Sequence, residues 1–302
     1  MSQGRYPGPP QAPQGFAQPM PSDLPQHARE RLMQMRQKKL FTSDLSINEF
    51  LLVKQAGFEP LGLVMGSSVY QMISLVPQVP WGQYGMEVGW MSHALYHSRE
   101  LAMNRMEEEA TELGADGIVG VRLEVNVHAF GQGILEFMAV GTAVRHANGV
   151  SFRNAHGKPF QSDLSGQDFW TLISAGYRPV GFVMGNCVAY VPPGTLMMTT
   201  GSSGDGQELS EYTHVLYDAR ELAIGRLQYE AESLHAEGIV GVTVTEKEHS
   251  WGAGMPGMPK RDGNAAYTTG ELIELFVVGT AVVRYDQGKA LPPVHLAVPL
   301  NK

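Results

Sequence analysis

The chain has 302 residues, of which 43% are hydrophobic and 17% charged, and this length suits roughly two globular domains. A net charge of −8 argues against a nucleic-acid surface, because such surfaces attract phosphates with an excess of Lys and Arg. The single cysteine, Cys187, excludes an intrachain disulfide and a thiolate-rich metal site. The sequence shows neither a run of about 20 apolar residues nor a secretory signal pattern, so we expect a cytoplasmic protein without a transmembrane segment.

The N-terminal region divides into a tail and a basic helix. Residues 1–26 are rich in Pro, Gln and Gly, which predicts a disordered tail. Residues 27–40 carry mostly basic charges, and Ser22 or Asp23 could cap a helix here. Its apolar positions share one helical stripe: Leu24, Ala28, Leu32 and Met35. Two interpretations stay open, namely a helix that docks on the first domain and a basic face that binds an anionic membrane surface or a protein partner.

The rest of the chain is a tandem repeat. The matching segments are 41–66 with 160–185, 93–121 with 214–242, and 135–144 with 273–282. The longest of these pairs is identical at more than half of its positions. A repeated supersecondary unit predicts two domains. Their expected bounds are 41–146 and 160–285, with a linker at 147–159 and a C-terminal tail at 286–302 that could add an edge strand.

Each repeat has the same pattern of elements. In chain order, the first repeat predicts a short helix at 46–55 capped by Ser43 or Asp44, a strand at 61–74, a long helix at 92–113, and strands at 118–127 and 135–144 joined by a turn at 130–133. The fold class is therefore α+β, with two tandem two-layer βαββ units, each with a short leading helix and an antiparallel sheet packed on one long helix. Because such a small sheet has open edges, we expect the other repeat or another subunit to cover them.

The apolar face of the long helix is the clearest periodic signal. Its stripe consists of Leu95, Ala102, Met106, Ala110 and Leu113 in the first repeat, and of Leu216, Ala223, Leu227, Ala231 and Leu234 in the second. This spacing predicts the side of each helix that packs on the sheet.

The sequence Gly-Ile-Val-Gly-Val follows the long helix in both repeats, at 117–121 and 238–242. A phosphate-binding loop leads from a strand into a helix N-terminus, whereas this segment leaves a helix C-terminus and enters a strand. We therefore interpret it as an architectural joint. Gly120 and Gly241 inside the strands predict a bulge or a close backbone approach. Gly114 has the position of a helix C′ residue, although His235 replaces it in the second repeat.

These residues resemble the YbjQ-like family, which carries a heavy-metal-binding label. The matching residues are 99–102, 113–121 and 141–144, with counterparts at 220–223, 236–242 and 279–282. The resemblance implies a small βαββ fold and ring-forming oligomers with five domains in single-domain members, and it implies no established enzymatic activity. Two repeats per chain give an even number of domains to a shared ring. Three arrangements stay open: five chains that stack two five-domain rings, three chains that form one six-domain ring, or no ring. Of these we favour five chains.

A polar face of each long helix offers candidate metal ligands. They are His93, His97 and Glu100 in the first repeat, and His214, Asp218 and Glu221 in the second. Imidazole and carboxylate groups suit Zn, Ni or another divalent metal such as Fe(II). Positions i and i+7 stand about 10 Å apart along a helix, so a neighbouring subunit would have to complete the coordination. The alternative is a solvated polar face near the start of the helix.

Two arginines fall inside the apolar stripe. Arg99 and Arg220 must find partners there, and Glu136 and Glu274 recur near the start of the last strand. We predict the structural ion pairs Arg99–Glu136 and Arg220–Glu274, with an anion site as the alternative.

The second repeat carries an insertion at 247–270 and another at 192–207. Trp251, Met255 and Met258 predict a partner-binding loop, with disorder and copper(I) binding as alternatives. Cys187 lies in a predicted strand and is interpreted as a buried, inert thiol. No spacing resembles a nucleophile elbow, so we predict no catalytic residues. The sequence thus favours a non-catalytic, self-assembling binding or scaffold module, with a divalent or heavy-metal-binding protein as the alternative.

Overall fold

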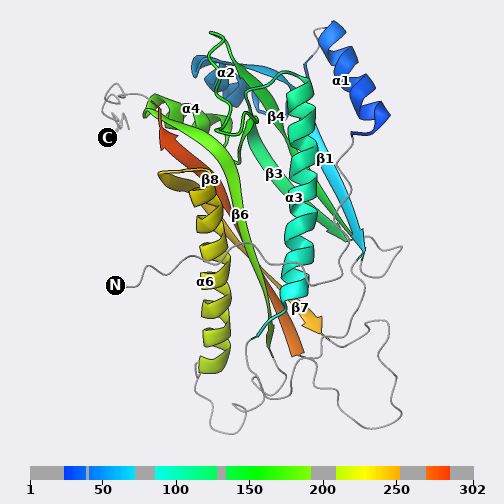
Figure 1. Ribbon diagram of the computed structural model, residues 1–302, viewed down its shortest axis with the longest axis vertical. Coiled ribbons are helices and arrows are strands. Elements are labelled where there is room, and N and C mark those ends of the chain that lie inside the picture. The colour runs from blue at the N-terminus through cyan, green and yellow to red at the C-terminus, as the bar shows by residue number, and fades with distance from the viewer. Residues whose placement is uncertain are drawn as a thin grey trace, which may run out of the picture.

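The computed structural model describes residues 24–38, 41–71, 86–127, 134–191, 209–251 and 270–285 (Figure 1). The first repeat contains α2 (Ile47–Gln55), β1 (Phe58–Gln71), α3 (Gly89–Glu112), β3 (Gly117–Val127) and β4 (Ile134–His146). The second contains α4 (Gly166–Ser174), β6 (Tyr177–Val191), α6 (Ser210–Ser233), β7 (Gly238–Trp251) and β8 (Gly270–Arg284). The α+β class and the two tandem units are confirmed.

Several bounds and one cap differ from the expectation. The side chain of Ser46 accepts a hydrogen bond from the backbone of Glu49, and the Glu49 side chain accepts one from the backbone of Ser46. This capping box makes Ser46 the N-cap, so the prediction of Ser43 or Asp44 was wrong. The loop expected from residue 247 begins later, because β7 continues to Trp251. Met255, Met258, the 192–207 insertion, the 130–133 turn, the C-terminal tail, Ser22 and Asp23 lie outside the described residues.

Each long helix packs on its own sheet, and in Figure 1 the two helices run roughly parallel with β6 between them. All five stripe residues of α3 are buried, as are Ala223, Leu227 and Ala231 of α6. Glycine lets the helix approach the strand: a Cβ at Gly66 would collide with the backbone of Ala102. Gly185 has the same relation to Ala223, so helix and strand meet backbone to backbone in both repeats.

The two sheets exchange short strands. In the first sheet the order is β1-β4-β3-β5, and in the second it is β2-β6-β8-β7. Strand β5 (Phe160–Ser162) comes from the second repeat but pairs in parallel with β3 of the first. Strand β2 (Met86–Glu87) comes from the first repeat but pairs with β6 of the second. The expectation that another repeat covers a sheet edge is therefore confirmed for β3 and β6.

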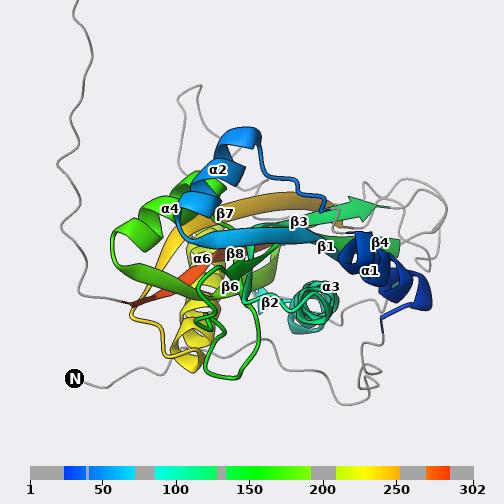
Figure 2. The same ribbon diagram turned by 90° about the horizontal axis from the view of Figure 1, so that it is seen from above.

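The basic helix α1 (Gln26–Lys38) docks on α3 (Figure 2). Leu24 and Leu32 are buried, and the Arg31 guanidinium donates to the carboxylate of Glu109 at 2.5 Å. Of the two interpretations left open for this helix, docking on the first domain is confirmed. Partner binding by its outer face stays a prediction.

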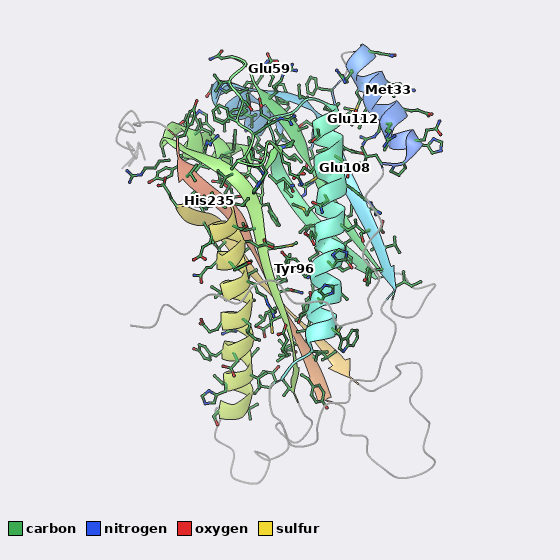
Figure 3. The ribbon with its side chains drawn as sticks, in the orientation of Figure 1. Met33, Glu59, Tyr96, Glu108, Glu112 and His235 are labelled. Carbon is green, nitrogen blue, oxygen red and sulfur yellow. The ribbon has the colours of Figure 1, made fainter. Side chains whose placement is uncertain are left out.

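The Gly-Ile-Val-Gly-Val segments form the joint expected of them. Gly120 has a φ of 69° and Gly241 a φ of 67°, and the strand register shifts at both places. The predicted bulge is therefore present in both repeats. After the helices, Gly114 has a φ of 74°, and His235 adopts the same left-handed conformation with a φ of 56°. Figure 3 labels His235 at the end of α6. The positive φ is thus required at this joint even where the residue is not glycine.

Candidate assembly interface

The contact between the two repeats combines an added strand with a buried polar network. Strand β5 follows β3 with Phe160, Gln161 and Ser162 opposite Gly117, Ile118 and Val119. The hydroxyl groups of Ser162 and Thr280 lie 3.0 Å apart, which fixes β5 against its own repeat. The backbone N–H of Gly120 donates to the carbonyl of Leu164 at 3.1 Å. The second repeat therefore offers a short strand to the first while staying attached to its own sheet.

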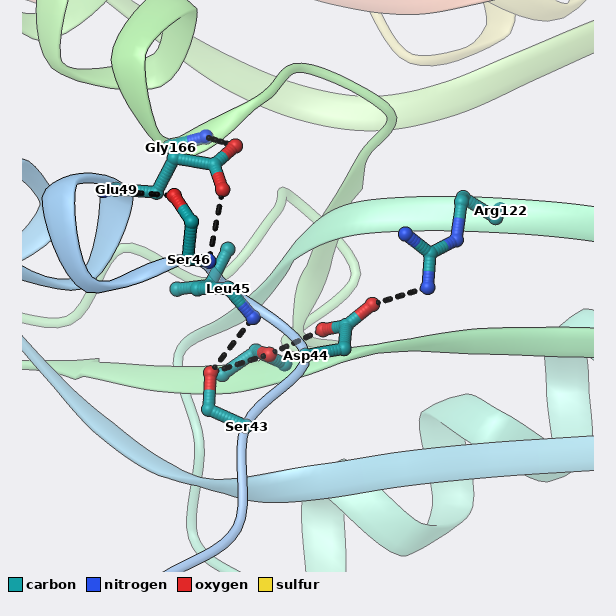
Figure 4. A network of polar contacts seen from close by, with 8 residues as sticks. Ser43, Asp44, Leu45, Ser46, Glu49, Arg122 and Gly166 are labelled. Carbon is teal, nitrogen blue, oxygen red and sulfur yellow. Dashed lines mark hydrogen bonds and ion pairs between the residues drawn. The ribbon is translucent and has the colours of Figure 1, made fainter.

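The first repeat holds its equivalent segment in the same way. The hydroxyl groups of Ser43 and Thr142 lie 3.1 Å apart, and Thr142 donates to Asp44 at 2.7 Å. Arg122 donates to the other oxygen of Asp44 at 2.8 Å (Figure 4). Unlike β5, residues 41–43 have no strand partner among the described residues.

A buried ion pair crosses the same contact. Nη2 of Arg99 on α3 lies 2.5 Å from Oε1 of Glu274 on β8, and both side chains are buried. The guanidinium also lies over the ring of Phe276, 3.9 Å from its centroid. The predicted Arg99–Glu136 pair was wrong, since Arg99 reaches the equivalent glutamate of the other repeat. A charge that enters an apolar interface needs a partner there, and β8 of the second repeat supplies it.

The second predicted pair is also wrong. Arg220 donates to Glu246 on β7 at 3.3 Å, and both groups are partly exposed. Glu274 is already bonded to Arg99. Arg220 has the same position on α6 as Arg99 has on α3, but its side chain is 41% exposed, and among the described residues no further repeat faces it.

The N-terminal end of α3 completes the contact. The side-chain amide of Asn186 donates to the Ser92 carbonyl at 2.8 Å, and the Ser92 hydroxyl accepts from the Val188 backbone at 2.9 Å. Arg226 of α6 donates to both carboxylate oxygens of Glu87, at 2.6 and 2.9 Å. These polar contacts were not predicted, because sequence spacing within one repeat says nothing of neighbours in the other.

Equivalent residues differ sharply in burial. Val121 is 3% exposed, whereas Val242 at the same position of the second repeat is 50% exposed. Val188 is fully buried, whereas its equivalent Val69 is 62% exposed. Tyr96 is 9% exposed and Tyr217 57% exposed. Val121 and Val188 belong to a core cluster to which both repeats contribute, whereas the exposed Val69, Tyr217 and Val242 lie on β1, α6 and β7.

The candidate metal ligands are only partly brought together. The rings of His93 and His97 stack with their centroids 5.9 Å apart, and His97 Nδ1 lies 3.3 Å from Glu100. Burial lowers the pKa of His93 below its usual value, and the neighbouring His97 acts in the same direction. His214, Asp218 and Glu221 are exposed. Within the described part of the chain no three His, Cys, Asp or Glu side chains form a group able to hold a metal ion, so metal binding stays a prediction.

Cys187 is buried on β6, and burial raises the pKa of its thiol to about 12, which agrees with the inert thiol expected from the sequence.

Glu230 on α6 is a second titratable group with a shifted pKa. Burial raises the pKa of Glu230 to about 8, although part of this residue reaches solvent. Its carboxylate accepts from the Met184 backbone at 2.7 Å. The equivalent Glu109 has the same backbone contact and the added charge of Arg31, so aligning the repeats could have revealed the difference.

No helix in the ranges that the structure describes is long and apolar enough to cross a membrane.

A cleft of about 410 Å³ lies where β3 faces the second sheet, with Arg99, Val121, Phe182 and Glu274 among its lining residues. Arg99 and Glu274 form the buried ion pair in its lining, beside charged residues of both repeats such as Arg122 and Lys247. The cleft is therefore part of the contact between repeats.

Comparison with known proteins agrees with this organisation. A protein of Mycobacterium tuberculosis described as an encapsulin nanocompartment protein is 44% identical over 273 residues, which cover 90% of this chain and 96% of the relative. A UPF0145 protein of Methanococcus maripaludis is 35% identical over 96 residues, covering 30% of this chain and 80% of the relative. The YbjQ family model, described as "Putative heavy-metal-binding", matches residues 60–147 and 177–284. The chain belongs to the YbjQ family and carries its domain twice in tandem.

Proposed function

We propose that this protein is a non-catalytic building block that assembles with copies of itself into a closed protein shell. The observation that carries the proposal is the unequal burial of equivalent residues. Val242 and Tyr217 at one end, and Val69 at the other, are exposed where their equivalents are covered by the neighbouring repeat. Large exposed apolar side chains favour a contact with another protein, because association removes their surface from water and so stabilises the complex.

The similarity to the mycobacterial relative supports this function. That relative is described as an encapsulin nanocompartment protein, and the alignment covers nearly all of both chains. A shell subunit needs interfaces on both sides of a rigid unit, and two repeats joined by exchanged strands form such a unit.

Native mass spectrometry and electron microscopy of the untagged full chain test the proposal. We expect closed particles whose mass is a multiple of the 32.9 kDa chain at micromolar concentration. A monomer under these conditions would overturn it. Open filaments or small dimers would contradict the closed shell.

A second candidate function is the binding of a divalent metal, favoured by the stacked rings of His93 and His97 and by Glu100 beside them. A neighbouring copy would complete the coordination of Zn²⁺ or Ni²⁺. Isothermal titration of the wild type and of the His93→Ala/His97→Ala variant tests this function, with His156→Ala as the control at an exposed site. Equal heats for the wild type and the double variant would exclude the site.

A further inference from the structure

We propose that residues 41–43 of one copy add to the open edge of β7 in the next copy and pair in parallel with residues 238–240. This inference rests on the proposed self-assembly and names the contact that carries it. The template is the pairing of β5 with β3 inside the chain. The equivalent pairs between copies are Phe41 with Gly238, Thr42 with Ile239, and Ser43 with Val240.

The donating segment is already held as β5 is held. Phe41 stacks on Phe50 with ring centroids 5.3 Å apart, and Phe160 stacks on Phe169 at 6.0 Å. The Ser43–Thr142 contact likewise repeats the Ser162–Thr280 contact. Phe41 is nevertheless 47% exposed, whereas Phe160 is fully buried. A segment fixed in its bound conformation loses little conformational entropy on pairing, which favours association.

The accepting edge has a space of the matching shape. The ring of Phe160 covers Gly117 so closely that a Cβ there would collide with it. At Gly238 the nearest atom to such a Cβ is a methyl group of Val282, 3.9 Å away. The space that Phe160 fills beside Gly117 is thus open beside Gly238, and the ring of Phe41 would fill it. Among the described residues, β7 has β8 as its one strand partner.

The same contact brings α6 against β4 of the next copy. Arg220 then approaches Glu136, as Arg99 approaches Glu274 inside the chain. Glu136 has contacts of its own within the chain, so this pair is an addition to them. Val242 and Tyr217 of one copy meet the face of the next copy that exposes Val69. Strand, ion pair and apolar surface therefore point to the same neighbour.

This arrangement is head-to-tail, with the second repeat of each copy against the first repeat of the next. A contact of this kind closes into a ring when its rotation permits and otherwise continues as a filament. First and second repeats alternate in it, so any closed ring contains an even number of domains. Both repeats of a chain then belong to one ring. In two stacked five-domain rings, by contrast, each repeat of a chain would belong to a different ring.

The first test is Gly238→Ala. The added Cβ has room in the free chain but occupies the place of the Phe41 ring in the assembly. We expect an unchanged unfolding midpoint for the isolated chain and a 10- to 100-fold weaker assembly, about the cost of overpacking one contact. Gly89→Ala is the matched control, since no atom lies within 4 Å of its Cβ. Wild-type assembly by Gly238→Ala would overturn the inference.

The second test is oxidative cross-linking of Thr42→Cys/Ile239→Cys. The buried Cys187 does not compete, and directly paired strand positions are close enough for a disulfide. We expect a ladder of linked chains from the double variant and none from either single variant. The Gln161→Cys/Ile118→Cys variant is the intrachain control with the same pairing and should link within one chain.

The outcomes separate the two proposals. If the wild type is monomeric, the proposed function fails and this contact fails with it. If the wild type assembles but the ladder is absent while the intrachain control links, this contact alone is wrong. Pairing of β7 with the chain's own residues 286–302 would give that second outcome.

Discussion

Arg99 and Glu274, which are far apart in the sequence, form a buried ion pair between the two repeats, with Nη2 and Oε1 2.5 Å apart. Each residue has an equivalent in the other repeat, Arg220 for Arg99 and Glu136 for Glu274. Of the possible pairs, the fold brings Arg99 and Glu274 together. The contact therefore depends on the arrangement of the repeats as much as on either repeat alone.

Removing one member of this pair should be costly. For Arg99→Met we expect a loss of roughly 3–5 kcal/mol in the free energy of unfolding, because the buried carboxylate of Glu274 loses the positive charge 2.5 Å away. Urea denaturation followed by circular dichroism measures this loss. Arg122→Met is the control, since its pair with Asp44 is largely exposed on the arginine side and should contribute less than about 1 kcal/mol. Equal losses in both variants would contradict the role given to Arg99.

Helix and strand approach closely at Gly185, and a side chain there should be excluded. In Gly185→Ala the Cβ collides with the backbone of Ala223, so either α6 or β6 must shift. We expect a loss of at least about 1–3 kcal/mol by thermal or urea unfolding. Gly89→Ala, which adds a Cβ in open space, should keep the stability of the wild type or raise it slightly.

The left-handed conformation at His235 should be a source of strain. Gly114 has the same position in the first repeat, so His235→Gly restores a residue that adopts this φ freely. We expect a gain of about 1 kcal/mol in stability. The reciprocal Gly114→His should lose a similar amount, and a destabilised His235→Gly variant would show that the imidazole makes a compensating contact.

Glu230 should make stability depend on pH. Because its pKa is raised to about 8 in the folded state from an unfolded value of 4.5, folding favours the protonated carboxyl. Its contribution is fully present below pH 4.5 and is lost as pH rises towards 8, with a slope of at most about 1.4 kcal/mol per pH unit. Glu230→Gln should remove this slope in urea titrations at several pH values. A variant that keeps the wild-type slope would assign the pH dependence to another group.

Cys187 should resist alkylation while the protein is folded. Its pKa of about 12 leaves almost no thiolate at pH 8, and the side chain is buried. Mass spectrometry after iodoacetamide treatment should find the thiol unmodified under native conditions and fully modified in urea. Rapid native labelling would mean that β6 opens locally.

The sequence repeat made the architecture of each unit predictable. The helical stripe of α3, the order of elements and the bulge at Gly120 all follow from local spacing and glycine chemistry. The cap of α2 was misplaced because Ser43, Asp44 and Ser46 all suit a helix start, and tertiary contacts with Thr142 use the first two. Local sequence does not distinguish side chains that cap from those that bond to a distant strand.

The contacts between repeats could not be read in the same way. Glu136 and Glu274 have equivalent positions, so periodicity offers Arg99 two partners and no means of choosing between them. The exchange of β2 and β5 was likewise invisible, because segments of two and three residues carry no periodic signal. The Glu230 site had a detectable signal, since its repeat equivalent Glu109 lies beside a basic helix that has no counterpart before the second repeat.

The exchange of β5 has a consequence for how the protein folds. The duplicated piece of chain begins just before each leading helix, at residues 41 and 160, whereas the first sheet is completed by β5, which belongs to the second copy of that piece. We therefore expect the unit that folds cooperatively to extend beyond one repeat. A fragment that ends at the linker would leave the edge of β3 without its partner strand β5. A fragment that begins at the linker would contain β5 without β3, the strand with which it pairs. Duplication and cooperativity thus have different boundaries in this chain, and neither half is a complete molecule.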